Sequence, residues 1–535
     1  MGEQNVKLNS DEATSQAFMK ALLVEVNALE RMLERGLFES GVRRIGAEQE
    51  MFLVDRAHKP APRALDILDV IDDPRFTHEL GLFNLEANLS PHRLEGNCFR
   101  AMEAELQEIY RKARESAGRF DCDVALVGIL PTLTKANLGL DSMVPTPRYH
   151  ALNAAICAMR GKEFGFTING IDQLSVQHDN VMLEACNTSF QVHFQVSPEN
   201  FAKNYNIAQV ITAPLLAAAV NSPILLGKRL WHETRIAVFE YSIDTRSDIH
   251  QERGLKPRVH FGDHWLEESV SEIFKEDIAL FNATPTTETE EDPLGMIEDG
   301  VIPSLNALRL HNGTVYRWNR PCYGVKDNVP HLRIENRILP SGPSVRDEVA
   351  NAAFWFGMMT GMREEYPDIT EVMDFQDARE NLVAAARRGL GSHFAWPDRG
   401  HVPSQELILN ELLPLARRGL AAVVLHVGSY RGLGVTYRKL KRWVEQQQLE
   451  SRGSDWEEFL VGRVGDENDR LGDPLGDRFR ALRVALDDLD LVGLLERECK
   501  PDADVAAAGD HDAPHRVLEA PDFAHEHADV LAVRD

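Results

Sequence analysis

Four separate stretches of this sequence alternate apolar and polar residues, and this alternation constrains the fold more than any other feature. The stretches are RRIGAEQEMFLV at 43–54, FNLEANLS at 83–90, SFQVHFQVS at 189–197 and HLRIENRIL at 331–339. Because successive side chains of a strand point to opposite faces, each stretch has one apolar and one polar face. The pattern predicts strands of an antiparallel sheet that buries one face and leaves the other accessible.

The polar faces of these predicted strands carry an unusual set of side chains. In chain order they present Glu48 and Glu50, then Asn84, Glu86 and Asn88, then Gln191, His193 and Gln195, and finally Arg333, Glu335 and Arg337. Taken singly, each stretch is most simply an amphipathic strand with a solvated side. The combination is harder to explain in that way, because Lys, Thr and Ser would serve a plain solvated face.

Glu48 and Glu50 bring two negative charges to the same face of one strand. Such a pair is either solvated or neutralised by a cation, for example a divalent metal with oxygen ligands. Side by side, the four strands would offer four carboxylates for Mg²⁺ and two arginines for phosphate. These groups are the components of phosphoryl transfer from a nucleotide. The common nucleotide and nucleophile motifs are absent from the sequence, which offers no competing site.

Composition narrows the class of protein. The chain of 535 residues has 58 basic and 84 acidic residues, a net charge of −26 at pH 7. A nucleic-acid-binding protein would show a basic face, so this balance argues against one. The sequence has no signal peptide at its polar start, no apolar run long enough to span a bilayer, and no C-x-x-C among its six cysteines. We therefore expect a soluble cytoplasmic protein with neither nucleic-acid nor membrane partners.

The remaining sequence can be divided in outline. Helical periodicity appears at 11–36 and 99–117, and the apolar run at 123–130 predicts a further strand. The acidic, turn-rich segment 280–300 predicts a mobile loop. From 344 to about 500 the sequence is mainly helical, and the Ala- and Asp-rich end predicts a disordered tail. Four histidines of that tail could bind metal only on a packed scaffold: His511, His515, His525 and His527.

The order of these motifs resembles a known family. GAEQEMFLVD, an L-E-x-N-x-S strand, an H-x-Q strand and E-N-R-I-L-P follow one another as in glutamate-cysteine ligases of the second type, which are carboxylate-amine ligases related to glutamine synthetase. The segment DARENLVAAARRGLGSHFAW at 377–396 is similar to a helix of that family, with matches at Glu380, Asn381, Arg387 and Gly389. The resemblance covers residues 40–430, about three quarters of the chain.

This resemblance implies an α+β fold. Its catalytic part would be a curved, mainly antiparallel sheet of about six strands, of the glutamine synthetase-like type, with helices packed on the convex side. The expected divisions are an N-terminal helix at 1–40, the catalytic domain at 41–430, a helical C-terminal region at 431–500 and a disordered acidic tail at 501–535.

The resemblance also implies roles for individual residues, with ATP and Mg²⁺, or Mn²⁺ in place of Mg²⁺, as cofactors. The implied metal ligands are Glu48, Glu50, Glu86, His193 and Glu335. The implied nucleotide-binding residues are Gln191, His193, Gln195 and Arg337, and the implied catalytic residues are Arg333 and Arg337. The chain departs from the family's usual alternation at Asn336, which lies between Glu335 and Arg337, and at Arg333 before them.

Other residues have two interpretations each. Arg235 and Arg246 could bind a substrate carboxylate, or they could form ion pairs with Glu233, Glu240 or Asp244. Arg148 and Tyr149 could contact substrate, or they could belong to a helix entry held by packing. The segment YRWNRPCYG at 316–324 could stack on a base, or it could pack Trp318 and Tyr323 into the core. Asp179 and Glu184 receive no role.

Three functions follow from this sequence. The first is an ATP-dependent ligase that forms a γ-glutamyl amide through an acyl phosphate, with cysteine or a different amine as the partner and glutamate or another acid as the carboxylate. The second is phosphotransfer to a guanidino compound or a carboxylate on the same fold. The third is a non-catalytic binding module, and the presence of four acids on one face argues against it, because a site without catalysis has no physical need for them. A homo-oligomer is compatible with each.

Overall fold

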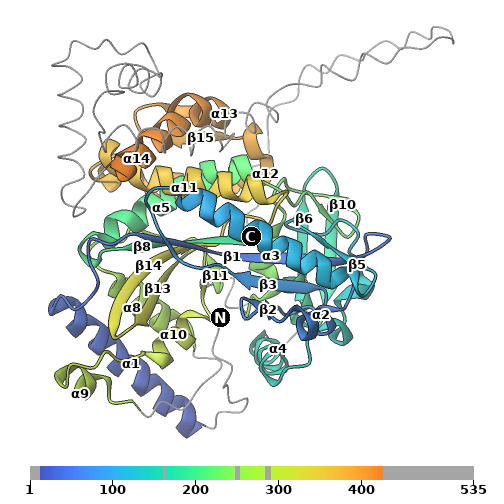
Figure 1. Cartoon of the computed structure of the whole chain (residues 1–535), viewed down its shortest axis with the longest axis horizontal. Helices are drawn as coiled ribbons and strands as arrows, with labels where there is room; N and C mark the ends of the chain where they lie inside the picture. Colours follow the sequence, from blue (N-terminus) through green and yellow to red (C-terminus); the bar gives the residue numbers. More distant parts are fainter. Residues whose placement is uncertain (1–11, 161–163, 247–252, 283–290, 426–535) are drawn as a thin grey trace, which may run out of the picture.

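The computed structural model describes residues 12–160, 164–246, 253–282 and 291–425. The predicted helical region at 431–500, the predicted tail and its four histidines lie outside the described residues. Figure 1 shows a central sheet with helices on both sides of it. No helix in the described ranges has the length and apolar character needed to cross a membrane.

The central sheet has eight strands, six of which form a continuous antiparallel order, β13-β14-β8-β1-β3-β2. β4 and β5 both pair with β1. The strands are β1 (Arg44–Asp55), β2 (Phe76–His78), β3 (Asn84–Asn88), β4 (His92–Arg93), β5 (Cys122–Ala125), β8 (Phe190–Val196), β13 (Asn319–Lys326) and β14 (Val329–Asn336). The prediction of a mixed fold around a six-stranded antiparallel sheet is confirmed. The strand predicted at 123–130 is only half as long, because β5 ends at Ala125.

The alternation in β1 explains how the sheet is buried. From Arg44 to Glu50 every second residue is buried, whereas Met51 to Val54 are all buried. The first half of the strand therefore has one accessible face, and the second half is covered on both faces. β8, at the centre of the sheet, is buried along its whole length, so its polar residues must find partners inside the protein.

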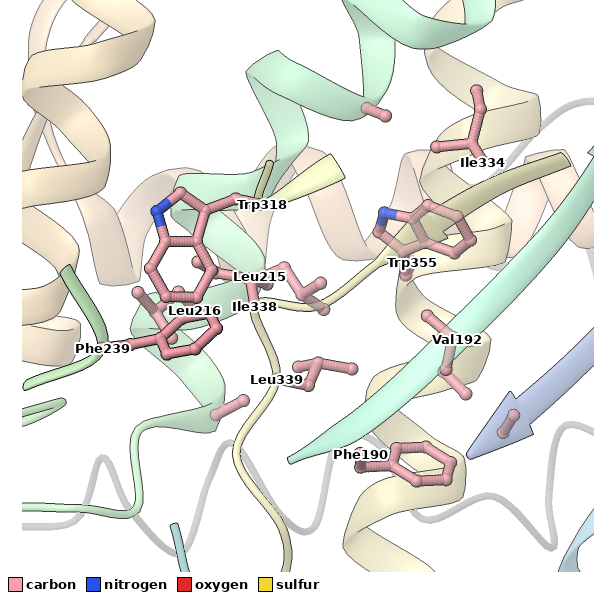
Figure 2. Close-up of a cluster of buried hydrophobic side chains, with 14 of the residues drawn as sticks. Phe190, Val192, Leu215, Leu216, Phe239, Trp318, Ile334, Ile338, Leu339 and Trp355 are labelled. Carbon is pink, nitrogen blue, oxygen red and sulfur yellow. The ribbon is translucent and has the colours of Figure 1, made fainter. Parts of the chain in front are cut away.

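One face of the sheet packs on three long helices, α3 (Cys98–Gly118), α5 (Phe201–Ala219) and α11 (Val345–Glu365). Phe194 of β8 contacts the rings of Trp355 and Phe356 on α11, with centroid separations of 6.2 and 5.9 Å. Figure 2 shows how side chains of β8, β14, α5 and α11 meet in this core. The burial of these aromatic rings makes this face the hydrophobic core of the fold.

A second group of helices lies on the other side of the sheet (Figure 1). Here α1 (Glu12–Glu34) packs against α8 (Val270–Leu280), α9 (Pro293–Glu298) and α10 (Asn306–Asn312). The buried carboxylate of Glu25 accepts hydrogen bonds from the amides of Ala307 and Leu308, at the start of α10. The prediction of a loop throughout 280–300 is wrong in part, because α9 forms within it; residues 283–290 lie outside the described ranges.

The C-terminal part of the described chain is mainly helical, as predicted for 344 onward. It contains α11, α12 (Phe375–Arg388), α13 (Ser404–Leu407) and α14 (Leu413–Leu425), interrupted by a hairpin of β15 (His393–Trp396) and β16 (Gly400–Pro403). α11 and α14 cross closely at glycines: a Cβ on Gly361 would lie 2.6 Å from the carbonyl oxygen of Leu415. Only a residue without a side chain permits this approach.

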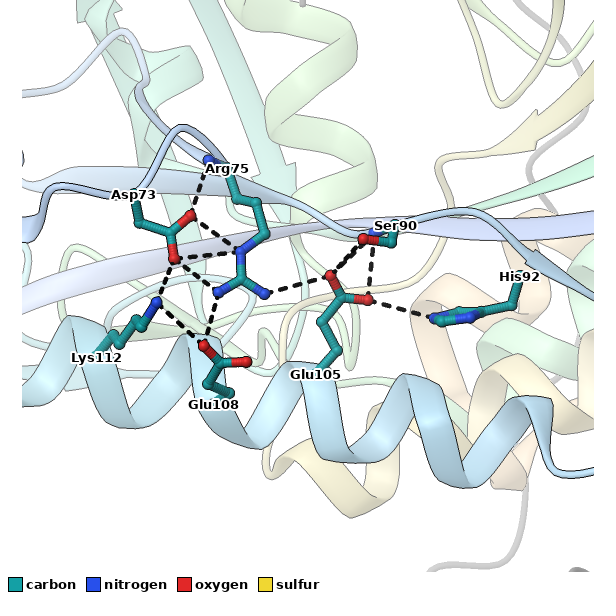
Figure 3. A network of polar contacts seen from close by, with 7 residues as sticks. All are labelled: Asp73, Arg75, Ser90, His92, Glu105, Glu108 and Lys112. Atoms are coloured by element: carbon teal, nitrogen blue, oxygen red, sulfur yellow. Dashed lines mark hydrogen bonds and ion pairs between the residues drawn. The ribbon is translucent and has the colours of Figure 1, made fainter.

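A network of charged and polar residues connects the segments before β2 and after β3 to α3 (Figure 3). Arg75 donates to both carboxylate oxygens of Asp73 and also to Glu105 and Glu108 on α3. Lys112 Nζ lies 2.7 Å from Asp73 Oδ2. The Arg75 guanidinium outweighs the effect of burial and holds the pKa of Asp73 well below its usual range. These contacts hold the segment between α2 (Ala64–Ile71) and β2 in place.

Smaller elements complete the described chain. They are α2 (Ala64–Ile71), α4 (Pro147–Arg160), α6 (Arg235–Ser242), β6 (Phe164–Asn169), β7 (Gln173–His178), β9 (Ile224–Leu225), β10 (Lys228–Arg229), β11 (Val259–His260) and β12 (Tyr316–Arg317).

Candidate active site

A cleft of about 580 Å³ lies over the polar face of the sheet. Six strands of the central sheet contribute to its wall, and α4, α10 and the turn at 181–186 contribute further lining residues. Its charged lining residues are Glu48, Glu50, Glu79, Glu86, Arg148, Glu184, Arg309, Arg320, Arg333, Glu335 and Arg337. The cleft therefore gathers six carboxylates and five guanidinium groups from distant parts of the chain.

The register of the sheet explains this gathering. Glu50 of β1 lies opposite Glu86 of β3, and Glu48 lies opposite Gln191 of β8. On the other side of β8, His193 lies opposite Glu335 of β14. Neighbouring strands thus place these side chains on one face, so that Glu48, Glu50, Glu86 and Glu335 line the same cleft.

One group of carboxylates is close enough to share a metal ion. Glu50, Glu79 and Glu86 each offer an oxygen, and these oxygens lie within 4.8 Å of one another. Glu79 follows β2 directly, and it has no place in the strand pattern of the sequence. A divalent cation with hard oxygen ligands fits this group.

The electrostatics of this first group also fit a cation. Burial and the charge of Glu86 raise the pKa of Glu50 to about 7, although Arg337 acts in the opposite direction. Burial, together with the charge of Glu86 and a hydrogen bond to it, raises the pKa of Glu79 well above its usual range. Carboxylates that repel one another in this way gain stability when a cation lies between them.

The carboxylate of Glu50 is held in a fixed orientation. Its two oxygens accept hydrogen bonds from the amide of Ser189, at 2.7 Å, and from Gln191 Nε2, at 2.8 Å. Its backbone carbonyl accepts hydrogen bonds from Gln49 Nε2 and Ser341 Oγ on the core side of the sheet, each at 2.8 Å. The side chain is thus positioned before any ligand binds.

A second group consists of Glu48, His193 and Glu335. His193 Nε2 lies 3.2 Å from Glu48 Oε1, and His193 Nδ1 lies 4.0 Å from Glu335 Oε2. The buried Nδ1 has no hydrogen-bond partner among the described residues. Burial would raise the pKa of Glu48, but His193 outweighs it and lowers that pKa to about 2. The imidazole can bind a metal ion through this unused nitrogen only when the ring is neutral. Among the described residues, only Glu50, Glu79 and Glu86 place ligand atoms within 4.8 Å of one another.

Arg337 and Arg320 lie beside this second group. Arg337 donates to Gln191 Oε1 at 2.6 Å and also pairs closely with Glu335. Arg320 Nη1 lies 3.2 Å from Glu335 Oε1. These guanidinium groups outweigh burial and keep the pKa of Glu335 well below its usual range. Glu335 is therefore ionised, and positive charge lies next to it in the cleft.

Arg333 also lines the cleft, next to a glycine that makes room for it. A Cβ on Gly324 would lie 2.7 Å from His331 Nε2 and 3.1 Å from Arg333 Nη1. Gln195, in contrast, does not line the cleft, and the expected nucleotide contact is not supported by its position. Its amide nitrogen donates to Glu39 Oε2 at 2.8 Å and its oxygen accepts from Arg44 at 2.8 Å.

Arg235 and Arg246 lie outside the cleft wall, and the ion-pair interpretation holds for both. Arg235 is buried, pairs with Glu233 at 3.0 Å and also donates to the backbone carbonyls of residues 337 and 338. Arg246 pairs with Asp244 at 2.8 Å. The expectation that these two arginines bind a substrate carboxylate is therefore corrected. Arg235 instead supports the backbone that carries Arg337.

Arg148 and Tyr149 line the cleft from the first turn of α4. The Tyr149 ring meets His78 edge to face, and its hydroxyl lies 3.4 Å from His78 Nδ1. Each of the two interpretations of the aromatic segment at 316–324, stacking on a base or packing into the core, fits some of its residues. Trp318 packs in the core, whereas Tyr316 lines the cleft, and buried Tyr323 does both.

The chain matches the family model of glutamate-cysteine ligase family 2 over residues 44–452. The chain belongs to this family. Its fold is similar to that of a glutamate-cysteine ligase from Francisella tularensis in complex with AMP, with 12% identity and a TM-score of 0.43 over 86% of this chain and 98% of that one. It is also similar to a bifunctional glutathione synthetase from Pasteurella multocida, with 12% identity and a TM-score of 0.40 over 88% of this chain and 55% of that one. Sequence comparison with curated proteins finds no match.

Membership of glutamate-cysteine ligase family 2 confirms two predictions, namely the family and an ATP-dependent ligase as the class of enzyme. The helix motif of the resemblance has a structural role in this member. Asn381 on α12 exchanges two hydrogen bonds with the backbone of Ala395, in the hairpin that follows. Arg387 lies over the ring of Trp231, 4.9 Å from its centroid.

Two acidic residues of the cleft could not be predicted from strand patterns. Glu79 lies just after a strand of three residues, and Glu184 lies in the 3₁₀ turn η3 (Val181–Cys186). Neither segment has an alternation long enough to indicate which way a side chain points. Of the acids near this edge of the sheet, only Glu86 lies in a stretch whose alternation predicts the direction of its side chain. A search for isolated acids between predicted strands would have found both residues, among many others.

Proposed function

We propose that this member of glutamate-cysteine ligase family 2 joins the γ-carboxylate of glutamate to an amine, with cysteine as the first candidate, and that it consumes ATP with Mg²⁺ as the cofactor. The observation that carries this proposal is the group of Glu50, Glu79 and Glu86 in the same cleft as Arg337. The family supports the class of reaction. Glutamate and cysteine are the substrates that the name of the family suggests.

The two groups of ligands would hold two divalent ions. Glu50, Glu79 and Glu86 would bind one ion, and Glu48, His193 and Glu335 would bind the other. The first group is made of oxygen donors only, which favours Mg²⁺, and the imidazole of the second is also compatible with Mn²⁺. Such ions neutralise the charge of phosphate groups in the transition state.

The guanidinium groups of the cleft would act on the phosphoryl group. A carboxylate is a poor electrophile, so the acid would first accept the γ-phosphoryl group of ATP and form an acyl phosphate, which the amine then attacks. Arg337 is held by Glu335 and Gln191 and faces the cleft, where its fixed charge would stabilise the phosphoryl group in flight. Arg333 and Arg320 line the same wall and would add positive charge.

The end of the cleft at α4 would bind the acid substrate. Arg148 supplies a guanidinium there, and Tyr149 and Tyr316 supply ring faces. An Arg side chain can bind a carboxylate through two parallel hydrogen bonds, which would orient the amino acid. This assignment replaces the expected role of Arg235 and Arg246.

The test is a panel of amines incubated with the protein, ATP, Mg²⁺ and glutamate, with product masses read directly. We expect a γ-glutamyl amide, and release of ADP and phosphate only when acid and amine are both present. Glu50→Gln should abolish product formation, and Glu95→Gln, at an exposed position, should not. ADP with a stable phosphorylated acid or guanidine would instead identify a phosphotransferase. ATP-independent binding without turnover would leave only a binding module.

A further inference from the structure

Glu184 is the charged residue of a short, well-anchored turn beside the cleft. The turn η3 is capped at its start by Asn180, whose side chain accepts a hydrogen bond from the amide of Met182 at 2.9 Å. The other five residues of the turn are buried, whereas Glu184 lines the cleft. Packing of the turn therefore directs one carboxylate toward the reaction space.

The carboxylate of Glu184 differs from the other acids of the cleft because it lacks a partner. Glu50, Glu48 and Glu335 are bound by Gln191, His193 and Arg337, respectively. Within the described ranges, the Glu184 carboxylate makes neither a hydrogen bond nor an ion pair. A desolvated carboxylate without a partner is costly, so such a group favours a cationic ligand.

The surroundings of Glu184 combine apolar side chains with charges of both signs. Leu152, Val181, Ile243 and Leu310 line the same cleft, as do Tyr149, Tyr316 and the guanidinium of Arg148. The charge of Glu184 acts on Tyr316, and the charge of Glu50 acts on Glu184. Burial, with the charge of Glu50, raises the pKa of Glu184 to about 7, despite the opposing effect of Arg337. A group of this kind can accept a proton near neutral pH.

We propose that Glu184 binds the ammonium group of the incoming amine and takes one of its protons, so that Glu184 is the general base of the second half-reaction. This inference rests on the proposed function. An ammonium nitrogen has no lone pair for attack, and transfer of one proton to the Glu184 carboxylate frees it. The nitrogen then forms the C–N bond, the C–O bond to phosphate breaks with its electron pair, and phosphate leaves. The second proton departs with the phosphate.

The experiment compares two nucleophiles in the variant Glu184→Gln. An α-amino acid such as cysteine is mostly an ammonium ion at neutral pH, whereas hydroxylamine is mostly unprotonated and needs no base. We expect amide formation to fall by about 100-fold or more in the variant. Hydroxamate formation from glutamate, ATP and hydroxylamine should stay within about threefold of the unaltered protein. Glu184→Asp, which keeps a carboxylate on a shorter stem, should recover part of the amide formation.

The matched control is Asp179→Asn, at an exposed acid of the same segment whose side chain accepts a hydrogen bond from Asn180 and whose backbone carbonyl accepts one from Cys157 Sγ. It should leave both reactions unchanged. Equal loss of amide and hydroxamate in Glu184→Gln would overturn the inference, because Glu184 would then act in the first step or in folding. Full retention of both would overturn it as well. If the unaltered protein forms neither product, the proposed function fails instead.

Discussion

At the scale of single residues, the main feature of the cleft is a group of closely spaced carboxylates. Glu79 is the member of the first group that the sequence pattern did not indicate, and its oxygen lies within 4.8 Å of those of Glu50 and Glu86. Its environment is costly for a negative charge, because burial and Glu86 both raise its pKa. A residue kept in such a position has either a ligand or a proton to compensate its charge.

We predict that Glu79→Gln lowers ligase activity by about 100-fold or more, because one oxygen ligand of the first ion is lost. Folding should be unaffected, since removing a repelled charge relieves the site. Binding of Mn²⁺, followed by electron paramagnetic resonance, should weaken by at least tenfold. Glu95→Gln serves as the control. Normal Mn²⁺ binding in Glu79→Gln would contradict the assignment.

Protons and metal ions should compete for the first group. The carboxyl of Glu50 has a pKa of about 7, and that of Glu79 is also raised, so both hold protons on the acidic side of neutrality. We therefore expect the affinity for Mn²⁺ to fall as the pH falls through about 7, and binding to release protons. Titration calorimetry in two buffers with different ionisation enthalpies measures this release. A site of ordinary carboxylates would show neither effect in this range.

At the scale of elements, the sequence was most informative where alternation was long. The faces of β1, β3, β8 and β14 follow the period of two, and the residues expected on the polar face lie there. His193 and Gln195 are exceptions, because neither lines the cleft. The amide group of Gln195 is bound by Arg44 and Glu39. Which strands pair is decided by contacts between distant segments, and a single sequence carries little information about them.

Most of the site residues that the sequence did not place correctly lie in short or irregular segments. The two interpretations of Arg235 could not be separated from the sequence, because a charged residue in a helix can either reach solvent or support a backbone, and periodicity does not distinguish the two. In the structure its guanidinium reaches the carbonyl of residue 338, a long-range contact. The same limit applies to Glu184, whose direction is set by packing of its turn.

The contact between α11 and α14 provides a test at this scale. We predict that Gly361→Val destabilises the protein by about 1–3 kcal/mol, because its side chain would collide with the backbone of α14 at Leu415. Gly118→Val, at the end of α3 where nothing lies within 4 Å, should cost much less. Urea unfolding measures both. Equal stability of the two variants would show that the helices separate without cost.

At the scale of the whole molecule, one cleft brings distant parts of the chain together. Its walls come from β1, β2, β3, β8, β13 and β14, and from α4 and α10, which lie far apart in the sequence. Ligands that bridge these elements bind only the folded chain, so they stabilise all of it at once.

We therefore predict that Mg²⁺ with a non-hydrolysable ATP analogue raises the thermal unfolding midpoint by several degrees. At a ligand concentration of 100 times the Kd, the expected stabilisation is about 2.7 kcal/mol. Differential scanning fluorimetry measures the shift. Glu50→Gln should lose most of it, and either component alone should give less than the pair. A full shift in Glu50→Gln would show that the nucleotide binds elsewhere.

In the proposed arrangement, Glu48 and Glu50 would bind different ions although one residue separates them in β1. A strand advances about 3.3 Å per residue, so covalent geometry fixes their backbone separation at about 6.6 Å. Neither centre can shift relative to the other without breaking the pleat. A slip of β1 by one position would turn both acids into the core together, and the enzyme would lose both ions in a single event.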